Sequence, residues 1–143
     1  KERENVTHFR GDLIIEAGNI RFGLDYRRPD PPDAFSARDE GQAIHILGDV
    51  AGSEVELIAV DCFKEVPHFH YGPRNRNESV YLDKTLVPDT LRWMLDRIKG
   101  GKLSGMILKA GYPDIAAQMD EGLVQSVFPE LEKQAIAMEK ANW

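Results

Sequence analysis

The sequence predicts an α+β fold, in which an N-terminal antiparallel sheet of about five or six strands is followed by three or four C-terminal helices. Up to Lys84, short runs of apolar residues are separated by turn-forming residues, which is typical of strands. After Lys84, apolar residues recur at the spacing of an amphipathic helix. The chain of 143 residues suits a single domain over residues 1–143, because one hydrophobic core usually serves about 100–200 residues.

The first two strands are expected to form a β-hairpin over residues 12–25, with Gly18-Asn19 as its two-residue loop. Pairing outward from this loop places six apolar side chains on one face, in the pairs Ala17 with Ile20, Ile15 with Phe22, and Leu13 with Leu24. The register is therefore self-consistent. The Pro-rich segment 27–33 that follows predicts a long surface loop.

Four further strands are predicted, over residues 42–47, 54–62, 67–71 and 78–83. Residues 48–53 are expected to form a turn, and residues 72–77 a loop. The continuous apolar run 57–60 is typical of a central strand with both faces covered.

Two amphipathic helices are expected around residues 91–98 and 103–110, because apolar residues occur there at i, i+3, i+4 and i+7. Gly100-Gly101 separates them. A third helix is expected from about Pro113 toward Glu121, and a last helix is expected to begin at Pro129, since proline suits the first helical turn.

One dense group of polar residues follows from the expected strand pairing. A turn at Lys64-Glu65 places Asp61 opposite His68 and Ala59 opposite His70, and the next pairing sets His70 against Ser79 and His68 against Tyr81. The predicted binding cluster on this face comprises Asp61, His68, His70, Ser79 and Tyr81. Cys62 and Phe69 fall on the opposite, apolar face.

Several chemistries suit this cluster. His68 and His70 project in parallel and can converge on one metal ion, with Asp61, Glu78 or His45 as the third ligand, but none of these three lies at a diagnostic spacing. Alternation on the wetter face of a sheet also explains the two histidines, and this interpretation is preferred. The sequence alone therefore assigns no metal and no cofactor.

A phosphoester-cleaving enzyme is the other alternative. An Asp61-oriented His68 would act as general acid or base, and Arg74 with Arg76 would bind the anion. The segment 74–77 is equally typical of a solvated turn. Whether the protein is an enzyme stays open.

Composition narrows the class of protein. The net charge of −6 argues against non-specific nucleic-acid binding, and the single cysteine, Cys62, excludes an internal disulfide. No apolar run approaches the length of a membrane span, so a soluble, cytoplasmic protein is expected.

The leading hypothesis is a non-enzymatic interaction or binding protein of unknown ligand. It is expected to form a homodimer. Trp93 lies outside the apolar stripe of its helix and either makes a second core contact or anchors a partner surface, and the second interpretation is preferred.

Part of the sequence resembles an uncharacterised prokaryotic family of small proteins. The residues that carry the resemblance are Asp61-Cys62-Phe63, Pro67-His68-Phe69-His70-Tyr71, Asn77-Glu78 and the segment 89–93. The resemblance covers residues 54–120 and no part of the first 50 residues. It implies a bacterial or archaeal cytoplasmic origin and no particular activity.

Overall fold

A computed structural model describes residues 10–28, 39–71 and 78–142. The six strands form one antiparallel sheet in which every strand pairs with the next along the chain. The strands are β1 (Leu13–Ala17), β2 (Ile20–Arg27), β3 (Gly41–Val50), β4 (Ser53–Phe63), β5 (His68–Tyr71) and β6 (Glu78–Tyr81).

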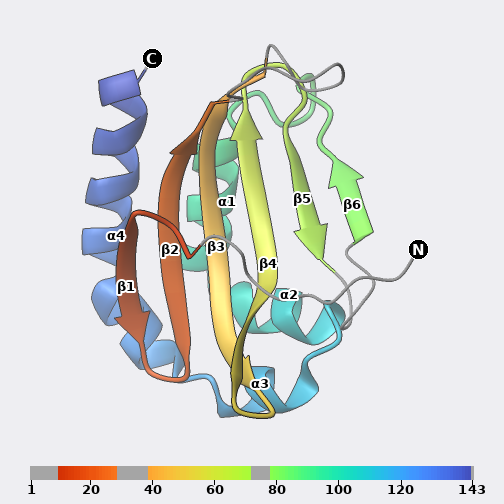
Figure 1. Cartoon of the computed structure of the whole chain (residues 1–143), viewed down its shortest axis with the longest axis vertical. Coiled ribbons are helices and arrows are strands. Elements are labelled where there is room, and N and C mark those ends of the chain that lie inside the picture. The colour runs from red at the N-terminus through yellow and green to blue at the C-terminus, as the bar shows by residue number, and fades with distance from the viewer. Residues whose placement is uncertain (1–9, 29–38, 72–77, 143) are drawn as a thin grey trace.

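Four helices follow the sheet: α1 (Thr90–Lys99), α2 (Leu103–Lys109), α3 (Pro113–Gln118) and α4 (Glu121–Asn142). Figure 1 shows α1, α2 and α4 behind the sheet, which turns its other face toward the viewer. The predicted α+β class is therefore confirmed.

The hairpin of β1 and β2 has the predicted register. Ala17 pairs with Ile20, Ile15 with Phe22 and Leu13 with Leu24. Gly18, the first loop residue, has φ of 71°, a conformation that glycine adopts without steric cost. The Pro-rich segment lies partly outside the described residues, and β2 extends through Arg27.

The connection between β3 and β4 is tighter than expected. We predicted a turn over residues 48–53, but β3 continues to Val50 and only Ala51 and Gly52 lie between the strands. Both have positive φ, 52° and 82°, so this is a two-residue hairpin loop of the kind that suits the twist of the strands.

A β-bulge in β4 determines which side chains share a face. Ile46 pairs with Ile58 but Leu47 pairs with Glu56, so Leu57 is an extra residue in β4. One extra residue reverses the alternation of side chains. Leu57 and Ile58 therefore both join the core, while Glu56 lies on the same face as Ala59 and Asp61.

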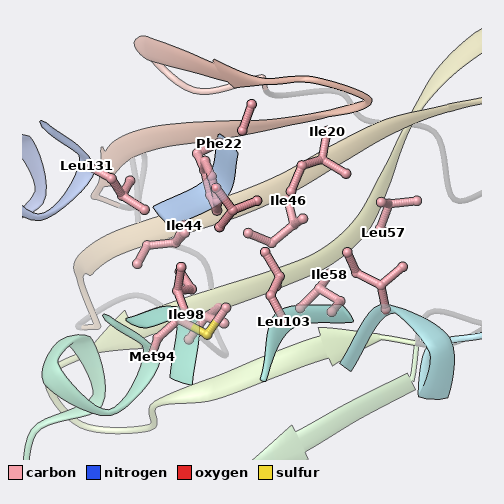
Figure 2. Packing of buried hydrophobic residues seen from close by; sticks show 14 of the residues in the cluster. Ile20, Phe22, Ile44, Ile46, Leu57, Ile58, Met94, Ile98, Leu103 and Leu131 are labelled. Atoms are coloured by element: carbon pink, nitrogen blue, oxygen red, sulfur yellow. The ribbon is translucent and has the colours of Figure 1, made fainter. Parts of the chain in front are cut away.

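The core lies between the sheet and the helices. Figure 2 shows side chains of the sheet pointing toward side chains of the helices. The sheet residues are Ile20, Phe22, Ile44 and Ile46, and the helix residues are Met94, Ile98, Leu103 and Leu131. All eight are fully buried. The periodicity that predicted α1 and α2 thus corresponds to side chains that pack on the sheet.

Our expectation that the last helix begins at Pro129 is wrong. Helix α4 begins at Glu121 and runs through Pro129 to Asn142. Val124 and Phe128 precede the proline and are buried together with Leu131 and Ala135, so core packing keeps the helix continuous across the proline. Asp120 begins the helix by accepting a hydrogen bond from the Leu123 amide.

None of the described helices is both long and apolar enough to cross a membrane.

Candidate functional site

The polar cluster predicted from the sequence is assembled on the face of the sheet opposite the helices. Asp61 pairs with His68, which pairs with Tyr81, and in the neighbouring row Ala59 pairs with His70, which pairs with Ser79. This is the predicted register. Asp61, His68 and His70 therefore project from adjacent positions on two neighbouring strands.

Both imidazoles point at one oxygen of the carboxylate. The Oδ2 atom of Asp61 lies 3.1 Å from Nε2 of His68 and 2.9 Å from Nε2 of His70. The Asp61 side chain is only 3% exposed, whereas His68 is 15% and His70 is 26% exposed. The three groups thus form a compact cluster that solvent reaches from the histidine side.

Neighbouring groups fix the orientation of His68. Its Nδ1 lies 2.8 Å from the carbonyl oxygen of Val66. Its ring and that of Phe63 form a T-shaped pair with centroids 5.5 Å apart, and its centroid lies 5.3 Å from that of the Tyr81 ring. A carbonyl oxygen only accepts hydrogen bonds, so Nδ1 carries a proton and donates it.

This tautomer has a consequence for Nε2 of His68. In the neutral ring, Nε2 carries a lone pair, and that lone pair faces the carboxylate oxygen of Asp61, which is also an acceptor. Two acceptors at this distance repel each other unless a positive charge lies between them. That charge is either a proton on the imidazole or a metal ion.

His70 is oriented in a similar way. Its Nδ1 lies 3.0 Å from Oγ of Ser79, a hydroxyl that can donate or accept. When Nδ1 donates to Ser79, Nε2 of His70 is free to bind a cation. Histidine ligands of metals commonly donate their second ring nitrogen to a neighbouring acceptor, as both rings can do here.

The loop before His68 is held by Asp39. Its carboxylate accepts hydrogen bonds from the amides of Glu65 and Val66, at 3.0 and 2.9 Å. Because Val66 in turn accepts from His68, Asp39 helps to position this imidazole from outside the cluster. Sequence reasoning did not identify this contribution.

The pKa values reflect the electrostatics of the cluster. Burial alone would raise the pKa of Asp61, but hydrogen bonds from His68 and His70 and their charge hold it below its usual value. Burial alone would lower the pKa of His68, but the hydrogen bonds to Asp61 and the Val66 carbonyl raise it. The site therefore favours an anionic carboxylate beside positive charge.

The second oxygen of Asp61 is less well satisfied. Oδ1 is buried and has no hydrogen-bond partner among the described residues, and it forms an ion pair with Nη1 of Arg27 at 3.8 Å. A buried carboxylate oxygen without a donor is costly. This oxygen is thus a position at which a bound cation would add stability.

The geometry is compatible with a metal ion. The candidate ligand atoms of Asp61, His68 and His70 all lie within 4.8 Å of one another. Around an ion with bonds of about 2.1 Å, ligand atoms lie roughly 3.0 to 3.4 Å apart, so the two distances to Oδ2 are near the required values.

Other predicted site residues lie elsewhere or have other partners. Of the proposed third ligands, Asp61 joins the two histidines. The main chain of Glu78 pairs with Tyr71, and its side chain lies outside the described part of the structure. Arg74 and Arg76, the predicted anion-binding pair, lie outside the described residues. Burial and the charge of Asp61 raise the pKa of Cys62, and its thiol lies in the core, so it does not serve as a nucleophile here.

A second histidine site was missed by sequence reasoning. Nε2 of His45 lies 2.9 Å from Asp25 and Nδ1 lies 2.6 Å from Glu56. Burial opposes charging of this ring, but the two carboxylates raise the pKa of His45 to about 9. His45 is therefore a buried imidazolium with two anionic partners, and both of its nitrogens are already used.

The comparisons with known proteins give a family and no activity. A family model described as "Domain of unknown function (DUF7700)" matches residues 14–135. The match agrees with the expected resemblance to an uncharacterised family, but it begins within the first 50 residues, where we had found no resemblance. No curated protein and no solved structure matches the chain.

Proposed function

The chain belongs to this family of domains of unknown function, and we propose that it binds a divalent transition-metal ion through Asp61, His68 and His70. The observation that carries the proposal is the convergence of the Nε2 atoms of His68 and His70 on Asp61 Oδ2, at 3.1 and 2.9 Å, while Nδ1 of His68 donates to Val66. A metal ion satisfies both acceptors at once.

The donor set indicates the class of ion. Two imidazoles and one carboxylate suit Zn²⁺, Fe²⁺, Mn²⁺ or Ni²⁺ better than Mg²⁺ or Ca²⁺, which prefer all-oxygen sites. Structural zinc sites usually have four protein ligands, whereas three protein ligands leave a position for water or a substrate. We therefore favour a reactive site over a structural one.

The surroundings of the open side support this choice. His70 and Tyr81 are accessible there, and Tyr81 is 67% exposed. A bound ion would polarise water or a small anionic ligand that approaches over these residues. Arg27, close to Asp61, would add positive charge at the buried side of the cluster.

Metal binding is tested on purified chain that has been stripped with chelator and then titrated with Zn²⁺, Mn²⁺ and Ni²⁺. We expect one bound ion per chain by elemental analysis. The thermal midpoint should rise, because a ligand present at about 100 times its Kd stabilises a fold by about 2.7 kcal/mol. Asp61→Asn and His70→Gln should each remove both effects.

Glu65→Gln is the matched control, because Glu65 is an exposed carboxylate in the loop before β5. This variant should bind metal like the wild type. Circular dichroism at the titration temperature establishes that each variant is folded. If the wild type binds no ion, or if folded Asp61→Asn binds as tightly as the wild type, the metal site is excluded.

Two other sequence-based expectations, the homodimer and the prokaryotic and cytoplasmic origin, stay predictions. The non-enzymatic interaction role and the phosphoester-cleaving activity stay alternatives to the proposed metal site.

A further inference from the structure

A groove of about 260 Å³ lies on the helix-facing side of the sheet, away from the histidine cluster. Its apolar wall is formed by Phe69 and Tyr71 of β5, Trp93 of α1 and Met106 of α2. Ile58 of β4, Arg97 and Lys109 complete the lining. In size it falls just below the range of pockets that hold drug-sized ligands.

The groove arises from the way the helices cover the sheet. Phe69 pairs with the core residue Val60, so its side chain points to the helical side, opposite His68 and His70. In Figure 1, α1 lies behind β3 and β4 and α2 lies near the lower ends of β4 and β5, whereas β6 forms the right-hand edge of the sheet with no helix behind it. The aromatic residues of β5 are therefore only partly covered.

The rings in the groove are stacked in a fixed order. Phe69 stacks on Trp93 with centroids 6.0 Å apart, and Tyr71 lies 5.3 Å from Phe69. The guanidinium of Arg97 lies over the Trp93 ring at 5.3 Å. The groove thus has an apolar aromatic surface with a cation placed at one side of it.

The two cations of the groove have no anionic partner within the described part of the chain. Arg92, on the same helix as Arg97, forms ion pairs with Asp96 and Glu132. Neither Arg97 nor Lys109 has such a pair among the described residues, although the chain carries a net charge of −6. Two unpaired cations beside one apolar groove favour an anionic ligand with an apolar body.

We propose that this groove binds a small free carboxylic acid with an aromatic or branched aliphatic body. The body lies against Phe69, Trp93 and Met106, and the carboxylate lies between Arg97 and Lys109. Arginine and lysine both bind a carboxylate through charge-assisted hydrogen bonds. The site is on the opposite face of the sheet from Asp61 and does not depend on the proposed metal site.

The test uses 4-phenylbutyrate as probe and its uncharged amide as control. Trp93 reports binding by fluorescence in Trp143→Phe protein, because the chain has only two tryptophans. We expect saturable binding of the acid that is roughly tenfold or more tighter than that of the amide, as for loss of a charge-assisted hydrogen bond.

Variants locate the site. Arg97→Gln and Lys109→Gln should each weaken binding of the acid several-fold and leave binding of the amide unchanged. Lys99→Gln and Lys102→Gln change exposed cations outside the groove lining and should leave both unchanged. Met106→Phe should narrow the groove and weaken binding of both probes, and it adds no second tryptophan to the fluorescence signal.

Asp61→Asn should bind the acid normally, which separates this inference from the metal proposal. Equal affinity for acid and amide, no saturable binding at millimolar probe, or equal losses in the Lys99 and Arg97 variants would each overturn the assignment.

Discussion

His45 carries a charge in a place where charges are rarely stable. The ring is almost fully buried, and Asp25 and Glu56 flank it from the two neighbouring strands. These carboxylates raise its pKa from the ordinary value of 6.5 to about 9. A buried imidazolium of this kind is stable only while both partners are present.

The raised pKa of His45 makes the free energy of unfolding dependent on pH. The folded pKa is above the unfolded one, so the stabilisation is complete below about pH 6.5 and is lost as the pH rises through about 9. At about 1.4 kcal/mol per pKa unit, the loss is on the order of 3 kcal/mol. Urea unfolding between pH 6 and pH 10 measures it.

His45→Gln separates this effect from other titrating groups, because glutamine cannot titrate in this range. The difference in unfolding free energy between wild type and His45→Gln should shrink as the pH rises from 6.5 to above 9. Glu56→Gln should lower the pKa of His45, which NMR titration of the ring would show. A difference that is constant with pH, or a ring that titrates at or below 6.5, would contradict the assignment.

The two histidine sites differ in how far the sequence predicts them. Asp61, His68 and His70 follow from one short connection, because any symmetric turn at Lys64-Glu65 gives the same register. The contacts of His45 depend on the bulge at Leu57, which places Glu56 on the same face. No residue type in β4 predicts that bulge. Strict alternation of side chains along the strand therefore places Glu56 on the core face, opposite to Asp61.

Helix α4 is the element in which local sequence preference and tertiary packing disagree most. Pro129 has no amide proton, so it cannot donate to the carbonyl of Gln125, and an interior proline costs a helix about 3 kcal/mol. Local preference therefore predicted a helix that starts at this residue. The buried side chains on both sides of Pro129 outweigh that preference.

Pro129→Ala should stabilise the protein. The exposed proline makes no core contact that would be lost, and alanine restores the missing hydrogen bond. The greater entropy of the unfolded alanine chain offsets about 0.4–1 kcal/mol of this gain, so we expect a net increase of about 2–2.6 kcal/mol in unfolding free energy. Urea unfolding followed by far-UV circular dichroism measures it.

Pro113→Ala is the matched control, because Pro113 occupies the first turn of α3, where proline is favourable. That variant should be equal to or less stable than the wild type. A destabilised Pro129→Ala protein would mean that the proline makes a favourable contribution that its exposed position does not reveal.

At the scale of the whole molecule, the sheet separates two kinds of surface. One face carries the core, formed by strands β1 to β4 with α1, α2 and α4, and the other carries Asp61, His45 and their partners. The antiparallel order and the change of period after Lys84 were predictable, because each depends on neighbours in the sequence. The groove beside Trp93 was not, because it depends on where distant helices end on the sheet.

A core shared by sheet and helices predicts that both unfold together. Leu131 of α4 is fully buried in the same cluster as Met94 and Ile98 of α1. Leu131→Ala should therefore lower the unfolding free energy by about 2–5 kcal/mol, the usual cost of such a truncation.

In Trp143→Phe protein, fluorescence reports Trp93 on α1, and circular dichroism reports all helices. In urea, both signals should show one transition, and Leu131→Ala should move both midpoints by the same amount. If α4 unfolded separately, the substitution would shift only part of the circular dichroism signal and leave the fluorescence midpoint of Trp93 in place. Coincident shifts would mean that the groove beside Trp93 depends on the packing of the whole chain, although α4 does not line it.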